Sequence, residues 1–408
     1  MAETTHAGVK SSKRIELLDI MRALAILNVV VYHFYSKWFN ASFLIVPDGI
    51  AANLSRLEIF KGGSFFDLVK NIVSFVFVYG FMAVNVFLML SGFVLMLSVL
   101  KKPEKADKEG FWEFVWKRCK RIVWPLYVSI LVGIGIIVLR NVLFPNFAGD
   151  FLFGWLDIFK LIAVPFLFFD VETLQKFAGV YWFIPLILQL YLLFPFLNRW
   201  LRRVGPWKFL IPIFFITIAY RAYATYFLDT VPMGVVYPTQ NSYSFFTFFL
   251  PRLFEFALGM ALAWWYHKSP KLLDRLKGFW PVMLGIGFTF SGFFLNMYKP
   301  GWIFSDLAVT PGLFIVLFTL ARGIEKSPLL QKFFLRVGDV SYELYLIHDY
   351  VLGYVVIPLI FTYPVHSEMW FWILLPLYVI SSVAAARLSQ GLATLLEKFP
   401  SSFLSSKR

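Results

Sequence analysis

Apolar runs of about twenty residues recur along the chain, and each is long enough to cross the hydrocarbon core of a bilayer as a helix. Of the 408 residues, 59% are hydrophobic and 15% are charged, which is typical of polytopic membrane proteins. The predicted fold class is an all-α, polytopic membrane helical bundle. We expect ten spans, near residues 17–35, 76–100, 122–139, 180–197, 208–227, 245–265, 279–297, 303–321, 338–360 and 370–389.

Basic residues are distributed unevenly between the two sets of segments that connect these spans. With a cytoplasmic N-terminus, 26 of the 38 Lys and Arg residues lie in inner segments and 8 in outer ones. This asymmetry follows the positive-inside rule and predicts that both termini are cytoplasmic. It also accounts for the net charge of +14, so nucleic acid is not expected as a partner.

The segment 151–169 is long enough to cross a membrane but contains Asp157, Lys160 and Pro165. Counting it as a span would invert every later connection and place the basic ones outside. We therefore expect an interfacial or re-entrant element on the outer face.

The chain is expected to form one membrane domain over residues 14–390, between cytoplasmic tails at 1–13 and 391–408. The first 16 residues are polar and lead into a full-length span, so the first helix should remain as an anchor and not be cleaved. Cys119 is the only cysteine, which excludes an internal disulfide and a cysteine-based metal cluster. No metal site is expected.

The first span carries a polar stripe within "DIMRALAILNVVVYHF". Arg22 and His33 are eleven positions apart, so they share one helix face about 16 Å apart along the axis, with Asp19 one turn below Arg22. A buried ionisable group in a span costs a few kcal/mol or more, which makes such a group a functional hypothesis by default. The alternative for His33 is a satisfied histidine in the core.

Other ionisable residues interrupt later spans: Arg221, Arg252, Glu255, Glu343, His348 and Asp349. Arg252 and Glu255 are spaced i,i+3 and could satisfy each other. Arg221 is expected to extend its charged end to the outer interface, with a substrate role as the alternative. For His348, a structural and a functional role stay open.

Two further patterns concern the second and third spans. In "RCKR", Arg118 and Arg121 lie one helical turn apart at the cytoplasmic mouth of the third span, where two guanidiniums can grip phosphate oxygens. Anionic lipid binding or topology alone would also explain them. Ser91 and Gly92 in the second span indicate close helix packing, with a direct role for Ser91 as the alternative.

These pieces in this order resemble the acyltransferase-3 family of bacterial integral-membrane acyltransferases. The resemblance rests on "RIELLDIMRALAILNVVVYHF", "GFMAVNVFLMLSGFVL", "RCKR", "YWFIPLILQLYLLFP", "RLFEFALGMAL" and "VGDVSYELYLIH". It implies a ten-helix bundle that transfers an acyl group, most often acetyl, from cytoplasmic acyl-CoA to a sugar hydroxyl facing away from the cytoplasm. It further implies that Arg22 and His33 are functional, with His33 as the base, and that Arg118 and Arg121 contact CoA phosphates.

The chain departs from the family's pattern at Ile187, where many relatives have a glutamate in the Trp-containing span. This departure suggests a different acceptor or donor. A C-terminal extracytoplasmic esterase-like domain, present in some relatives, is not expected, since the chain stops soon after the last expected span.

The resulting hypothesis is an O-acyltransferase of the bacterial inner membrane with no bound cofactor. Its expected partners are acyl-CoA, an extracytoplasmic glycan or glycolipid, and the lipid bilayer. A neutral imidazole suits the base role, while Asp19 and Arg22 would order the stripe near the cytoplasmic entrance. A covalent acyl-enzyme at Ser91 or a histidine stays open. The rival is a glycan or lipid-linked sugar transporter, against which we find no matching interrupted spans in two halves.

Overall fold

The computed structural model describes residues 16–38, 49–57, 63–143, 178–228, 248–362 and 368–405, with isolated positions between 145 and 165. These residues are helical, with no β-strand among them. The α-helices are α1 (Glu16–Trp38), α2 (Ile50–Leu57), α3 (Phe65–Val78), α4 (Ala83–Lys101), α5 (Pro103–Lys108), α6 (Phe111–Leu143), α9 (Phe183–Val204), α10 (Pro206–Phe227), α12 (Leu253–Lys268), α13 (Phe279–Leu295), α14 (Ser305–Ile324), α15 (Pro328–Asp339), α16 (Ser341–Val351), α17 (Ile357–Thr362) and α18 (Glu368–Ser405). Shorter helical turns are η1 (Tyr79–Met82), η4 (Gly179–Trp182), η5 (Leu250–Arg252), η6 (Pro270–Leu276), η7 (Pro300–Ile303) and the π-helical η8 (Leu352–Val356).

Eight stretches of helix in the described residues are long and apolar enough to cross a membrane: Glu16–Trp38, Phe65–Lys101, Phe111–Leu143, Gly179–Val204, Pro206–Phe227, Ser305–Ile324, Ser341–Ile360 and Met369–Glu397. The pair η6 and α13, bent by 76°, makes a ninth if it is counted as one span. These helices confirm an all-α, polytopic membrane bundle. The difference from the ten expected spans lies at 245–265, where α12 has 16 residues and is shorter than a full span.

The second span begins earlier than expected, because α3, η1 and α4 follow one another without a break from Phe65 to Lys101. Ser64 caps α3: its hydroxyl accepts a hydrogen bond from the Asp67 backbone N–H, and the Asp67 carboxylate accepts one from the Ser64 backbone N–H. This reciprocal pairing satisfies two donors that a helix start leaves unpaired. Residues 65–75, which lie between the first two expected spans, are therefore helical.

The α4 and α12 helices pack against each other through glycines. A Cβ atom added at Gly92 would lie 2.1 Å from the backbone oxygen of Phe256, and one added at Gly259 would lie 1.9 Å from that of Met89. Only glycine allows the two backbones to approach this closely. The packing role expected for the Ser91-Gly92 pair is thus confirmed for Gly92.

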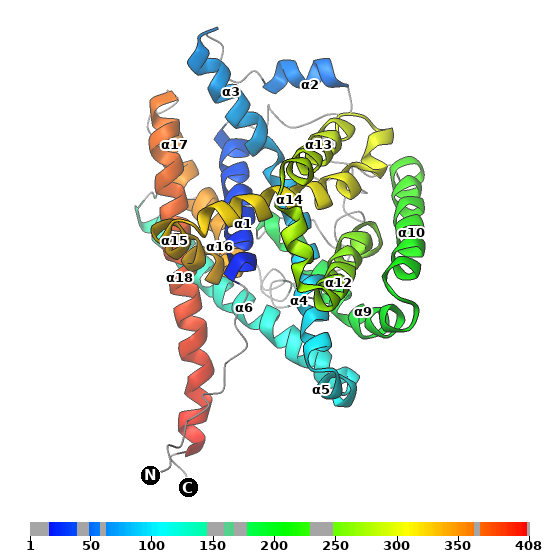
Figure 1. Cartoon of the computed structure of the whole chain (residues 1–408). Coiled ribbons are helices and arrows are strands. Elements are labelled where there is room, and N and C mark those ends of the chain that lie inside the picture. The colour runs from blue at the N-terminus through cyan, green and yellow to red at the C-terminus, as the bar shows by residue number, and fades with distance from the viewer. Residues whose placement is uncertain are drawn as a thin grey trace, which may run out of the picture.

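The α1 helix lies in the middle of the bundle, between α16 and α18 on one side and α4 and α14 on the other (Figure 1). Its cytoplasmic end, as we assign it, crosses α15, where a Cβ at Gly338 would lie 2.2 Å from the Asp19 backbone oxygen. Side chains on every face of α1 therefore meet other helices, and its polar stripe is placed inside the protein.

Three of the sequence predictions are not tested by the structure. The proposed re-entrant element at 151–169 lies almost wholly outside the described residues. The cytoplasmic placement of the termini and the domain limits at 14 and 390 stay predictions.

Candidate functional site

Seven helices enclose a cavity of about 660 Å³, which we call the chamber. Its volume is in the range usual for small-molecule sites. The chamber brings together six residues that the sequence analysis singled out on five separate spans, namely Arg22, Ser91, Arg118, Arg121, Ile187 and Glu343. Its wall also contains Val84, Phe87, Val94, Leu95, Ile122, Pro125, Phe183, Tyr191, Gly338, Asp339, Ser341, Tyr342, Tyr345 and Gln390.

The chamber is polar at one end and apolar at the other. Along α4 its wall runs from Leu95 to Val84, which is about 16 Å of helix. Since only the short α5 connects α4 to α6, Arg118 and Arg121 near the start of α6 lie at the Leu95 end. The Val84 end is lined by apolar and aromatic side chains, including Phe183. A ligand with one anionic end and one uncharged end fits this gradient.

The arginines at the polar end differ in how they are held. The Arg22 guanidinium donates to the Asp19 carboxylate over 2.6 Å, as expected for residues one turn apart. The Arg118 guanidinium lies 5.5 Å from the centre of the Phe114 ring. Among the described residues, no carboxylate forms an ion pair with Arg118 or Arg121. These two cations are therefore available for an anionic ligand.

The neighbouring lysine is engaged elsewhere. The Lys117 ammonium group lies 2.8 Å from a Glu109 carboxylate oxygen and 2.6 Å from one of Glu113. Lys117 does not line the chamber, so the positive charge that α6 contributes to the chamber wall comes from Arg118 and Arg121.

The two intramembrane histidines are in contact. His348 Nε2 lies 3.4 Å from His33 Nδ1, and the ring centres are 5.0 Å apart. His348 is fully buried and His33 is partly buried. The sequence analysis named both residues but did not predict their pairing, since no short spacing connects α1 to α16.

Backbone contacts define which nitrogen of each ring carries the proton. His33 Nδ1 lies 2.8 Å from the Val29 carbonyl oxygen, and His348 Nδ1 lies 2.9 Å from that of Leu344. A carbonyl can only accept, so each Nδ1 must carry a hydrogen. His348 Nε2 is then an acceptor that faces the His33 Nδ1–H, and His33 Nε2 keeps a free lone pair. This is the protonation state that a general base requires.

Tyr345 connects the histidine pair to the chamber. Its side chain lines the chamber wall, and its ring centre lies 6.1 Å from that of His348. Its hydroxyl donates to the Val180 carbonyl, which fixes the ring. Asp349, which directly follows His348 on the same helix, accepts a hydrogen bond from the Gly179 N–H over 2.7 Å. The pair thus lies one side chain beyond the chamber, and α16 is tied to the start of the fourth expected span.

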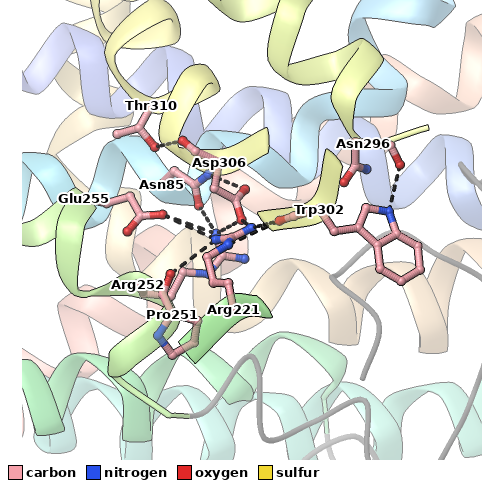
Figure 2. A network of polar contacts seen from close by, with 9 residues as sticks. All are labelled: Asn85, Arg221, Pro251, Arg252, Glu255, Asn296, Trp302, Asp306 and Thr310. Atoms are coloured by element: carbon pink, nitrogen blue, oxygen red, sulfur yellow. Dashed lines mark hydrogen bonds and ion pairs between the residues drawn. The ribbon is translucent and has the colours of Figure 1, made fainter. Parts of the chain in front are cut away.

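Arg221 does not extend to the interface, and this expectation was wrong. Its side chain is fully buried, with one guanidinium nitrogen 2.7 Å from an Asp306 carboxylate oxygen (Figure 2). It also donates to the carbonyl oxygens of Trp302 and Pro251. Arg221 was expected at the interface because it lies near the end of a span. Nothing in the local sequence indicated that Asp306 on α14 would be its buried partner.

Arg252 and Glu255 are near each other but are not each other's main partner. Their closest nitrogen and oxygen atoms are 3.9 Å apart, whereas Arg252 lies 2.8 Å from an Asp306 oxygen and donates to Asn85 over 2.7 Å. Asn85 in turn donates to Asp306 over 2.8 Å. We call the five residues Asn85, Arg221, Arg252, Glu255 and Asp306 the buried ion cluster (Figure 2).

The buried ion cluster joins α4, α10, α12 and α14, and none of its members lines the chamber. The structure therefore separates Arg252 and Glu255 from Arg22, Ser91, Arg118 and Arg121. Asp306 is the member that the sequence analysis missed, although an aspartate inside an apolar run was a signal for it. Both arginines depend on this carboxylate for charge compensation.

In the described residues, a helical bundle encloses a chamber with two arginines that have no ion-pair partner at one end and a pair of histidines beyond the other. The family model described as Acyltransferase domain matches residues 15–388. The chain belongs to this family, the acyltransferase-3 family, and is an acyltransferase and a multi-pass membrane protein.

One relative is similar over most of the chain. Peptidoglycan O-acetyltransferase OatA of Listeria monocytogenes serovar 1/2a is 24% identical over 367 residues, which cover 83% of this chain and 49% of OatA. The chain thus spans about half the length of that relative. No solved structure matches the chain significantly.

Proposed function

We propose that the protein transfers an acetyl group from acetyl-CoA, bound from the cytoplasmic side, to a hydroxyl of a glycan or glycolipid outside the cytoplasm. The acetyl group and the glycan acceptor are suggested by the name of the OatA relative. The bacterial inner membrane is the location in which acetyl-CoA and such a glycan face opposite sides. The observation that carries the proposal is the chamber, which begins at two unpaired arginines and ends beside a histidine pair.

The donor is bound by its phosphates. CoA carries its phosphates at one end and the thioester at the other, with an uncharged arm between them. Arg118 and Arg121 bind the phosphates with their planar guanidiniums. The arm then follows the chamber, about 16 Å along α4, and presents the thioester at the Tyr345 end.

His33 acts as the general base. Its free Nε2 removes the proton from the acceptor hydroxyl while the hydroxyl oxygen attacks the thioester carbonyl carbon. The carbon–sulfur bond breaks, and the imidazolium returns the proton to the leaving thiolate. The products are the O-acetyl ester and free CoA, so no other reactant is needed.

His348 supports the base. Its Nε2 lone pair lies 3.4 Å from His33 Nδ1, whose hydrogen is donated to the Val29 carbonyl, and it stabilises by electrostatics the positive charge that His33 acquires. The backbone carbonyls of Val29 and Leu344 hold both rings in the same tautomer. Arg22, kept in place by Asp19, adds positive charge to the chamber near the donor phosphates.

Inside-out membrane vesicles test this proposal directly. Acetyl-CoA labelled in the acetyl group is added outside such vesicles, where the cytoplasmic face is exposed, and glycan is enclosed within them. Label in the enclosed glycan supports transfer across the membrane. Label that never leaves CoA, with acetyl-CoA and with succinyl-CoA, contradicts the proposal and favours the transporter reading.

A further inference from the structure

Glu343 is a nearly buried carboxylate in the chamber wall. It lies in the first turn of α16, lines the chamber and is only 9% exposed. Among the described residues, no other residue forms a hydrogen bond or an ion pair with its carboxylate, although its own backbone N–H is within hydrogen-bonding range and the charges of Asp339, Arg387 and Arg121 act on it. A buried carboxylate without donors is costly. The carboxylate can therefore accept further N–H or O–H groups from a ligand in the chamber.

The position of Glu343 indicates which part of a ligand it meets. It precedes His348 by five residues on α16, which is about 7.5 Å along the helix axis. Toward the other end of the chamber, Arg121 is near enough for its charge to act on Glu343. The carboxylate thus lies between the arginines that bind phosphate and the histidine pair.

We propose that Glu343 accepts hydrogen bonds from the uncharged arm of the donor, a proposal that rests on the acyl-CoA donor proposed above. The pantetheine arm of CoA carries two amide N–H groups and one hydroxyl, and these are the donors that a carboxylate in mid-chamber lacks. Because a carboxylate repels phosphate, Glu343 also opposes binding in the reverse direction. The carboxylate therefore fixes how far the thioester reaches toward His33.

Comparing the binding of two ligands, CoA and adenosine 3′,5′-bisphosphate, distinguishes this role of Glu343 from a merely structural one. Adenosine 3′,5′-bisphosphate has two of the three phosphates of CoA but no pantetheine arm, whereas CoA has the arm as well. We expect Glu343→Ala to weaken CoA binding by about tenfold, the loss typical of a hydrogen bond to a charged group. Binding of adenosine 3′,5′-bisphosphate should be unchanged, which also shows that the variant folds. Glu343→Gln keeps an acceptor oxygen and should lose less affinity than Glu343→Ala.

The measurement is the Kd of each ligand for the full chain in nanodiscs. Glu104→Ala is the matched control, since it removes an exposed glutamate from α5, away from the chamber, and should change neither Kd. Equal weakening of both ligands by Glu343→Ala, or no weakening of either, overturns the role of Glu343 and leaves the donor assignment standing. A wild-type chain that binds neither ligand overturns both proposals.

Discussion

His33 and His348 are 315 residues apart in the sequence, and their ring nitrogens lie 3.4 Å apart in the fold. Each ring also meets the carbonyl of the residue four positions earlier in its own helix. The two rings are therefore direct neighbours, and under the proposed mechanism His348 supports His33 and is not a second base. This relationship leads to the first prediction.

Replacing His348 by alanine should lower kcat for acetyl transfer by about ten- to a hundredfold, because His33 loses the neighbouring lone pair and ring that stabilise its charge and pack against it. The KM for acetyl-CoA should stay within about twofold, since the donor phosphates bind at the other end of the chamber. Steady-state kinetics of the purified chain check this split. An increase in KM with unchanged kcat would place His348 in donor binding instead.

Reversing the charge of both Arg118 and Arg121 to glutamate should raise the KM for acetyl-CoA by at least about tenfold, because two charge-assisted contacts to phosphate are lost. The same change at Lys120 is the matched control. Lys120 is exposed on the same helix and does not line the chamber. If Lys120→Glu has an effect as large as the double variant, the arginines act through the general surface charge.

Asp306→Ala should destabilise the fold, since it leaves Arg221 and Arg252 buried without their shared carboxylate. Removing one partner of a buried ion pair typically costs about 3–5 kcal/mol. Thermal unfolding in detergent should show a clear drop in Tm. Removal of the exposed Arg322, which pairs with Glu325 at the surface, should change Tm little. Similar Tm values for the two variants would contradict the structural role of the buried ion cluster.

Gly92→Leu should prevent α4 from packing against α12, because the side chain would overlap the backbone of Phe256. Loss of folded protein in size-exclusion chromatography is the expected result. Gly135→Leu serves as the comparison, since a Cβ at Gly135 meets nothing within 4 Å. Folded Gly92→Leu protein with normal Tm would mean that the two helices are not held this closely.

The sequence predicted best what depends on local spacing. The shared face of Asp19, Arg22 and His33 follows from helical periodicity, and so does the nearness of Arg118 to Arg121. The all-α membrane bundle follows from the length of the apolar runs, although two of the helices, α12 and α13, are shorter than a full span.

Contacts between distant segments could not be predicted in this way. The pairing of His33 with His348, the chamber itself, and the choice of Asp306 as the partner of Arg221 and Arg252 all depend on which helices become neighbours. Local spacing even misled at Arg252 and Glu255, where i,i+3 separation suggested a pair. The carboxylate of Asp306, on α14, lies closer to Arg252 than that of Glu255 does.

Thiol release from acetyl-CoA by the purified chain tests the central claim, that His33 is the base of an acetyl transfer. Wild type, His33→Ala and His267→Ala are compared in nanodiscs with envelope glycan as acceptor; His267 is an exposed histidine outside the chamber. We predict release that requires glycan, is lost in His33→Ala and is retained in His267→Ala. Full release by folded His33→Ala protein would contradict the account.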